Sequence, residues 1–292
     1  MAKGAVANTP RVTEWILAGY FGYTALLALT LPLSGSTRIQ SICTSIGALA
    51  VLHCMGRWPR RHDPVLLRNL LPLGGVLIAY TQMGWFAQPR TNFALEEAWV
   101  RWDRLILDDW GVSEAIEVLG PVVPATLEFL YLLTYAVAPI GLLLLYSKGL
   151  LGRADRFLAI YVASAVLAYS LYPFFPSEPP RTVFPGDLSG RYETMFKQFN
   201  WWLLGGAGIH TSVFPSGHVS SAFGVGFGLL LAAPERKLWG GAMTALAAGI
   251  AVATVYCRYH YAVDAVAGLA TSAAASLACV FAFRYRNRVE LV

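Results

Sequence analysis

LWGGAMTALAAGIAVATVYCRYHYAVDAVAGLATSAAASLACVFAF, residues 238–283, contains two apolar runs joined by a short polar cluster. The runs, 238–256 and 261–283, each have about the 20 residues that a helix needs to cross the hydrocarbon core of a bilayer. The cluster between them, Arg258-Tyr259-His260, is followed by an aspartate, Asp264. This pattern predicts a hairpin of two membrane helices whose polar turn lies at one face of the membrane.

The same apolar pattern extends over the rest of the 292 residues, of which 56% are hydrophobic and only 13% charged. A soluble domain has about twice that charged fraction, so we predict an all-α, polytopic membrane helix bundle with about eight spans. The candidate spans are residues 13–33, 39–56, 66–86, 125–147, 155–175, 214–233, 238–256 and 261–283.

Two segments between the spans are not simple turns. Residues 92–118 have the pattern of amphipathic helices lying along the membrane surface. We expect Asp103 and Asp108 there to face water, and the alternative is that they contact the substrate. Residues 176–213 form the longest predicted loop, and loops of that length in compact proteins are usually functional. We therefore divide the chain into N-terminal membrane helices (1–90), an interfacial helical segment (91–120) and a membrane core (121–292).

The basic residues predict the orientation of the spans. With the N-terminus inside, 14 of the 22 Lys and Arg residues fall on the inner side and 8 on the outer side. Cytoplasmic loops carry the excess of basic residues, so we predict that both termini are inside and that residues 92–118 lie outside. The net charge of +5 is spread between the apolar runs, which argues against a nucleic-acid surface.

Three polar clusters interrupt the second half of the chain, at residues 179–181, 214–218 and 258–264. The third of them, residues 258–264, has the pattern of an oriented nucleophile. His260 and Asp264 are four residues apart, so on a helix their side chains share a face. A carboxylate that accepts one ring N–H of a histidine fixes the tautomer and leaves the other nitrogen free to attack. The structural alternative is an interfacial histidine near a helix-start aspartate. Ionisable groups inside membrane spans are costly, however, and usually functional.

Two further clusters fall on the same predicted face. Ser216, Gly217 and His218 open the sixth span, where the free N–H groups of a helix start favour a phosphate oxyanion. His218 is placed to give a proton to a leaving oxygen. Arg181 follows the fifth span and offers a planar, permanently charged group suited to phosphate. The structural alternatives are a simple helix-start signal at Pro215-Ser216-Gly217 and a snorkelling arginine at 181.

Together these residues resemble the type 2 phosphatidic acid phosphatase (PAP2) superfamily, whose motifs include Pro-Ser-Gly-His and a terminal His-x3-Asp. The similarity covers about residues 125–284. Within the superfamily, three motifs of this chain are most similar to the branch that includes inositol phosphorylceramide synthases. These motifs are Pro-Pro-Arg (179–181), Phe-Pro-Ser-x-His (214–218) and Tyr-x3-His-Tyr-x2-Asp (256–264).

The resemblance implies a role for each matching residue. His260 would be the nucleophile that forms a phosphohistidine, Asp264 its orienting partner and His218 the acid that protonates the leaving group. Arg181, Ser216 and Gly217 would hold the phosphate. No metal and no other cofactor are implied.

Two departures from the family pattern remove cations from the expected phosphate clamp. Phe174 stands where the first motif has a lysine, and Thr254 stands where the third motif has an arginine. We expect Arg258 to substitute, with the loop residues Lys197, Arg191 and His210 as further candidates. Glu128, near the start of the fourth span, could line the site or pair with an arginine.

These residues predict an enzyme that acts on a phosphorylated lipid at the outer membrane face. We expect the enzyme to transfer a substituted phosphate to an alcohol acceptor such as inositol or a sugar. A substituted phosphate carries less negative charge than a phosphomonoester and needs fewer cations to neutralise it, which fits the missing lysine and arginine. The alternatives are a simple lipid phosphate or polyprenyl (di)phosphate phosphatase and a non-enzymatic lipid transporter. The compact loops favour a bacterial plasma membrane, with the site facing the periplasm or exterior. The lipid, the acceptor and the oligomeric state stay open.

Overall fold

The structure is a computed structural model that describes residues 10–57, 65–86, 92–187, 192–208 and 212–289. All regular structure in these ranges is helical. Three helices come first in the chain: α1 (Val12–Thr30), α2 (Gly35–Gly56) and α3 (Val65–Gly84). The membrane core that follows contains α6 (Val122–Leu132), α7 (Val137–Ser147), α8 (Ala154–Leu171), α11 (Gly217–Ala232), α12 (Lys237–Tyr256) and α13 (Ala262–Val289).

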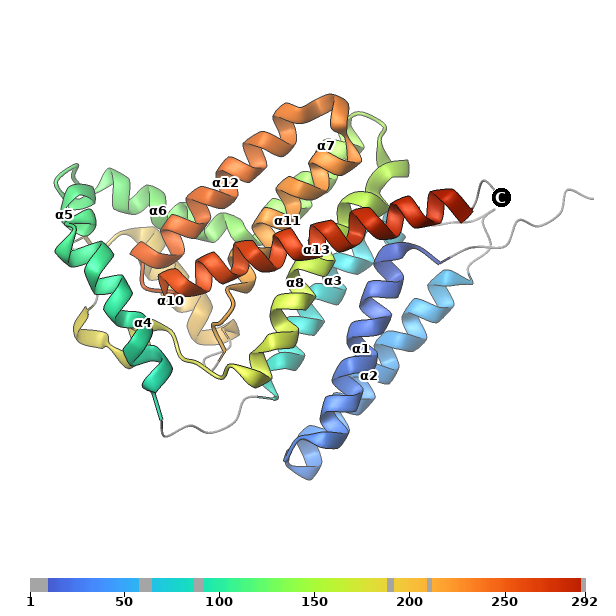
Figure 1. The fold of residues 1–292 in the computed structure, drawn as a ribbon, viewed down its shortest axis with the longest axis horizontal. Helices are drawn as coiled ribbons and strands as arrows, with labels where there is room; N and C mark the ends of the chain where they lie inside the picture. Colours follow the sequence, from blue (N-terminus) through green and yellow to red (C-terminus); the bar gives the residue numbers. More distant parts are fainter. Residues whose placement is uncertain (1–9, 58–64, 87–91, 188–191, 209–211, 290–292) are drawn as a thin grey trace, which may run out of the picture.

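Helix α11 is the central helix of the core, because α8, α12 and α13 all pack against it (Figure 1). Its glycines permit this close packing. A Cβ atom at Gly228 would lie 2.7 Å from the backbone oxygen of Phe157, and one at Gly226 would lie 2.9 Å from the backbone nitrogen of Thr244. These approaches bring α8 and α12 against α11, which begins at the predicted Ser216-Gly217-His218 cluster.

Helices α1 and α3 pack against α8 through an apolar cluster that also includes α2, and polar contacts at the ends of α1 and α8 add to this packing. The carboxylate of Asp155, in the first turn of α8, accepts hydrogen bonds from the backbone N–H groups of Val12 and Thr13. It therefore satisfies N–H groups that have no partner inside α1. Glu14 accepts a hydrogen bond of 2.8 Å from Nη2 of Arg68 on α3. This buried ion pair joins α1 to α3.

The helix lengths support fewer spans than the eight predicted. Within the residues that the structure describes, six helical segments are long and apolar enough to cross a membrane: Val12–Thr30, Gly35–Gly56, Val65–Gly84, Leu151–Phe174, Pro234–Tyr256 and Ala262–Tyr285. The fourth predicted span is a pair of helices, Val122–Tyr135 and Val137–Ser147, bent by 65°. It makes a seventh span if counted as one. The sixth predicted span is α11, which has only 16 residues, fewer than a straight crossing needs. The orientation with both termini inside stays a prediction.

The segment expected to lie on the membrane surface is helical in the structure. It forms α4 (Ala94–Arg104), a π-helical turn η2 (Leu105–Asp109) and α5 (Val112–Glu117). Figure 1 shows α4 and α5 at the end of the bundle where α12 leads into α13. Our expectation that both aspartates face water is wrong for Asp103, whose side chain is buried, and right for Asp108, which is half exposed.

The long loop predicted at 176–213 contains more helix than we expected. A short helix, α9 (Pro180–Val183), contains Arg181, and α10 (Met195–Ala207) runs for 13 residues. The side chain of Thr194 caps α10 by accepting a hydrogen bond from the N–H of Lys197. A threonine before an apolar run is a helix-start signal. The segment nevertheless resembled a loop in the sequence, because Gly205, Gly206 and Gly208 follow closely.

Candidate active site

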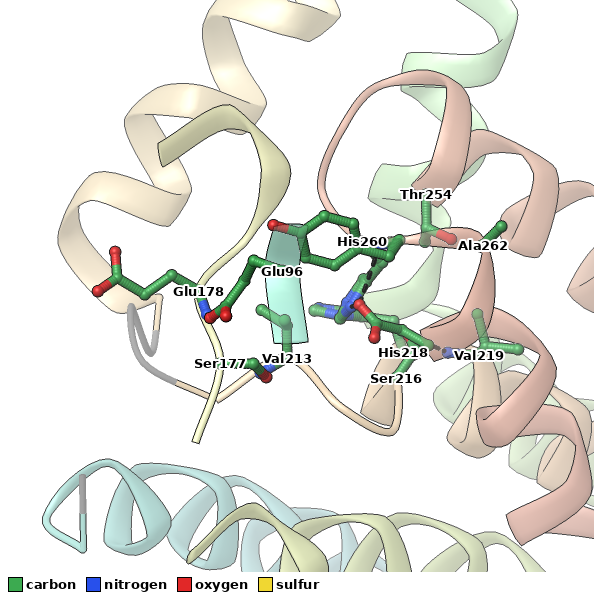
Figure 2. Close-up of polar contacts among 12 residues, drawn as sticks. Glu96, Ser177, Glu178, Val213, Ser216, His218, Val219, Thr254, His260 and Ala262 are labelled. Atoms are coloured by element: carbon green, nitrogen blue, oxygen red, sulfur yellow. Dashed lines mark hydrogen bonds and ion pairs between the residues drawn. The ribbon is translucent and has the colours of Figure 1, made fainter. Parts of the chain in front are cut away.

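His218, His260 and Asp264 form a continuous chain of hydrogen bonds. Figure 2 shows His218 and His260 next to each other. Nδ1 of His218 lies 3.1 Å from Nε2 of His260, and Nδ1 of His260 lies 3.3 Å from Oδ2 of Asp264. His260 is buried and Asp264 is fully buried, whereas His218 is partly exposed. The structure therefore brings together the second and third polar clusters of the sequence.

The bond to Asp264 decides which ring nitrogen of His260 is free. A carboxylate only accepts hydrogen bonds, so the proton belongs on Nδ1 of His260 and Nε2 carries a lone pair. The partner nitrogen, Nδ1 of His218, must then be the donor. In this assignment His260 has the lone pair of a nucleophile and His218 has the proton of a general acid.

His260 lies in the tight connection between α12 and α13 rather than on a helix. The carbonyl oxygen of Thr254 accepts hydrogen bonds from the N–H groups of both Tyr259 and His260. Arg258 in this turn has a φ of 59°, in the left-handed region. Asp264 belongs to the first turn of α13, and its Oδ2 also accepts a hydrogen bond of 2.9 Å from the N–H of Tyr261. One carboxylate thus caps the helix and orients the histidine.

The start of α11 is fixed to the start of α13. Ser216 caps α11, because its Oγ accepts a hydrogen bond from the N–H of Val219, and its own N–H donates to the carbonyl oxygen of Asp264. Gly268 permits this contact, since a Cβ there would lie 2.7 Å from the carbonyl oxygen of Ser216. A Cβ at Gly217 would lie 2.7 Å from the hydroxyl oxygen of Tyr172. Ser216 and Gly217 therefore hold His218 at the level of His260.

Arg181 joins the first polar cluster to the other two. Its backbone N–H donates to the carbonyl oxygen of Arg258, and its guanidinium carbon lies 5.2 Å from the centre of the Tyr259 ring. The positive charge of Arg181 acts on the rings of both His218 and His260. Arg181 is thus the predicted phosphate ligand that faces the histidine pair.

Arg258, the expected substitute cation, faces a pair of aspartates instead. Its Nη1 lies 3.9 Å from Oδ2 of Asp103 and its Nη2 lies 3.7 Å from Oδ1 of Asp108. The side chain is 3% exposed. Lys197 also has a partner, because its Nζ donates to Glu193. Arg191 and His210 lie outside the residues that the structure describes.

Neither departure from the family motifs is compensated at its own position. Phe174 is exposed, with 59% of its surface accessible. Thr254 is fully buried, and its hydroxyl donates to the carbonyl oxygen of Ala251 within α12. Neither side chain can supply the positive charge that the family has there.

A layer of aromatic residues and one carboxylate supports Arg181, and of these the sequence had pointed only to Glu128. The Tyr259 hydroxyl donates a hydrogen bond of 2.8 Å to Oε2 of Glu128, and the Tyr259 ring stacks on that of Tyr131. Nδ2 of Asn200 also donates to Glu128. Glu128 therefore supports the site through Tyr259 rather than through an arginine. Only the position of Tyr259, one residue before His260, could have signalled its role.

Burial sets the charge state of His260. Removal of the ring from water, together with the nearby charge of Arg181, lowers the pKa of His260 from 6.5 to about 3. The imidazole is therefore neutral over the physiological pH range, which is the state that a nucleophile needs. The described residues contain no group of three or more His, Cys, Asp and Glu side chains arranged to hold a metal ion.

Comparisons with known proteins show which family the chain belongs to. The family model described as PAP2 superfamily matches residues 100–278, more than half of the chain. A PA-phosphatase related-family protein of Dictyostelium discoideum is 29% identical over 123 residues, which are 40% of this chain and 22% of that protein. The chain therefore aligns with only about a fifth of that relative's length. No solved structure matches the chain. The match across all three polar clusters shows that the chain belongs to the PAP2 superfamily.

Proposed function

We propose that this protein is a membrane-embedded enzyme that transfers the phosphoryl group of a lipid through a phosphohistidine at His260. The observation that carries the proposal is the chain of contacts from His218 to His260 to Asp264, at 3.1 and 3.3 Å. In this chain the lone pair of His260 and the proton of His218 lie side by side. This is the pairing of a nucleophile with a general acid that double displacement requires.

The first step transfers phosphorus from the lipid to the enzyme. Nε2 of His260 forms a bond to phosphorus while the bond from phosphorus to a leaving ester oxygen breaks. The negative charge of the bound substrate favours a His218 protonated on both ring nitrogens, whose Nδ1–H protonates that oxygen and leaves a neutral ring. In a phosphomonoester the leaving oxygen belongs to the lipid, and in a phosphodiester it belongs to the head-group alcohol, so that the lipid stays bonded to phosphorus. The substrate phosphate has to enter between the two rings, so their hydrogen bond opens when substrate binds. Asp264 stabilises the positive charge that His260 gains as it attacks.

The second step regenerates His260. His218, now without its proton, takes a proton from water or from an alcohol whose oxygen attacks phosphorus. The bond from nitrogen to phosphorus breaks and the lone pair returns to Nε2 of His260. With water the product is inorganic phosphate from a monoester substrate or a phosphomonoester from a diester substrate. With an alcohol the product is a phosphate ester of that alcohol, and it is a new phosphodiester when the substrate was a diester.

Arg181 is the main phosphate ligand in this proposal. Its guanidinium is held against Tyr259, and its charge reaches both histidines. The start of α11 at Ser216 and Gly217 adds the positive end of a helix dipole, which favours an anion. Arg258 contributes less directly, because Asp103 and Asp108 partly balance its charge.

The charge of the site supports transfer of a substituted phosphate. Phe174 and Thr254 leave two cationic positions of the family clamp neutral. A phosphodiester carries one negative charge where an ionised phosphomonoester carries two, so it needs fewer cations. The likeness to the inositol phosphorylceramide synthase branch points to the same reaction, with inositol or another polyol as acceptor. We place the site at the outer face of a plasma membrane, as the basic residues predict.

The test uses the whole protein purified in detergent, with His260→Ala as the variant. His53→Ala serves as the control, because His53 is an exposed histidine on α2. Free phosphate and new phospholipids are followed with phosphomonoester and phosphodiester lipids, with and without a polyol acceptor. We expect a new phosphodiester lipid that requires the acceptor and is lost in His260→Ala alone. Phosphate release with every substrate would instead identify a phosphatase, and full activity of His260→Ala would disprove the phosphohistidine.

A further inference from the structure

One face of α4 contacts all three polar segments of the candidate site. Oε1 of Glu96 accepts a hydrogen bond of 2.9 Å from the N–H of Glu178, three residues before Arg181 (Figure 2). The ring of Trp99 stacks on Phe214, in the segment that leads to His218, at 5.2 Å between centroids. Oδ1 of Asp103 accepts a hydrogen bond of 2.9 Å from the N–H of Ala262.

These three contacts come from one helix face, because positions 96, 99 and 103 are three and four residues apart. Glu96 and Asp103 are fully buried under the site. Outside this face α4 carries exposed apolar side chains, with Trp102 at 64% and Leu95 at 40%. The buried face of this amphipathic helix therefore packs against the segments that carry the polar clusters rather than against the interior of the helix bundle.

Asp103 contacts residues that precede and follow His260 in the chain, Arg258 and Ala262. Its Oδ1 satisfies the N–H of Ala262, the first residue of α13, which has no partner within the helix. Its Oδ2 lies 3.9 Å from Nη1 of Arg258 and has no hydrogen-bond partner of its own. A single buried carboxylate thus holds residues 258 and 262, and His260 is midway between them.

The other backbone contacts of this connection come from the site itself, where the carbonyl oxygen of Thr254 accepts the N–H groups of Tyr259 and His260. Arg258 is in the left-handed region, which side chains other than glycine and asparagine rarely adopt, so contacts elsewhere must hold it. Asp264 also depends on Asp103, because its carboxylate belongs to the helix turn that Asp103 caps. A shift at Asp103 would therefore move His260 and its orienting partner together.

We propose that α4 is the positioning element of the active site and that Asp103 is a positioning residue for His260, although it touches neither substrate nor the reacting atoms. The proposal deepens the phosphohistidine mechanism and rests on it for its effect on rate. Its effect on the geometry of the His260 ring is independent of any activity.

Three variants separate the contacts of Asp103. Asp103→Leu removes both the cap and the charge, Asp103→Asn keeps an oxygen for the N–H of Ala262 but removes the charge, and Asp103→Glu moves the carboxylate by one methylene. Asp109→Asn is the matched control, because Asp109 is exposed at the end of η2. All are made in the whole protein in detergent.

The kinetic readout is the separation of kcat from KM with the lipid substrate that the wild type uses. We expect Asp103→Leu to lower kcat by on the order of 10²-fold with little change in KM, because misplaced catalytic groups affect the rate of the chemical step. Asp103→Asn should keep more activity than Asp103→Leu, and the control should match the wild type. Wild-type kcat in Asp103→Leu would overturn the proposal, as would a loss confined to KM.

The second readout is the nitrogen NMR spectrum of protein labelled at histidine, in which His260→Ala assigns the His260 signals. We expect Asp103→Leu to shift the two ring-nitrogen signals of His260 away from the fixed tautomer, while those of His53 stay in place. Unchanged His260 signals would overturn the proposal. If Asp103→Leu fails to fold, Asp103→Glu decides in the same two measurements. Because the spectrum needs no turnover, it gives this answer even if His260→Ala proves fully active and the proposed mechanism falls.

Discussion

Nδ1 of His218 and Nε2 of His260 lie 3.1 Å apart, although 42 residues separate them in the chain. The contact exists because α11 and α13 begin at the same level, joined by the hydrogen bond from the N–H of Ser216 to the carbonyl oxygen of Asp264. In the absence of substrate, these two ring nitrogens are hydrogen-bonded to each other. The relationship places the proposed nucleophile and the proposed acid within one hydrogen bond.

Asp264→Asn should fold but lose most activity. The amide can turn its NH₂ group toward His260 and favour the wrong tautomer, with the proton on Nε2 where the lone pair is needed. We expect kcat to fall by roughly 10³- to 10⁴-fold, as when the aspartate of a serine protease triad is replaced. The measurement is steady-state kinetics beside a thermal unfolding curve. Activity within tenfold of the wild type would show that Asp264 does not set the tautomer.

Arg181→Lys should weaken substrate binding even though the charge is kept. A lysine lacks the planar group that lies against the Tyr259 ring and that can donate two hydrogen bonds to one phosphate. We expect KM to rise more than kcat falls. Tyr259→Phe is the matched change, since it keeps the ring and removes only the hydrogen bond to Glu128. A smaller rise in KM for Arg181→Lys than for Tyr259→Phe would contradict the role given to the guanidinium.

Gly268→Ala should disturb the contact between α11 and α13. The new Cβ would lie 2.7 Å from the carbonyl oxygen of Ser216, so the backbone has to move. Overpacking of this kind costs about 1–3 kcal/mol, and the movement should separate His218 from His260 and lower kcat. Gly241→Ala is the control, because nothing lies within 4 Å of its Cβ position on α12. It should raise stability slightly, through the higher helix propensity of alanine. Equal thermal midpoints and kcat values for the two variants would refute this account.

Acid should destabilise the wild type more than His260→Asn. The pKa of His260 is lowered to about 3 in the folded protein, while the unfolded chain binds the proton near pH 6.5. The unfolded state therefore binds more protons between these values. The stability that comes from the neutral ring is present above pH 6.5 and is lost as the pH falls toward 3. Thermal midpoints in detergent at pH 7 and pH 5 measure the difference, and equal losses in both proteins would show that the ring is not held neutral.

The pairing of His260 with Asp264 could be predicted from the sequence, because the two residues are only four positions apart and a single turn brings their side chains together. The helical class could be predicted for a similar local reason, since long apolar runs must satisfy their own backbone hydrogen bonds in a membrane. The same runs gave the limits of most helices. They did not show that α11 is short or that the fourth span is bent, because packing against neighbouring helices sets both features.

The sequence by itself thus predicted the helices from their apolar runs and the pairing of His260 with Asp264 from its short spacing. The contact of His218 with His260 depends on how α11 and α13 pack. Only the tertiary structure decided the partners of Arg258 and the burial of Asp103. An amphipathic pattern reveals that a helix has a polar face, but that face can meet water or a buried polar segment from elsewhere in the chain. In this protein it meets the N–H of Ala262, 159 residues away, and contacts of that range depend on how the whole chain packs.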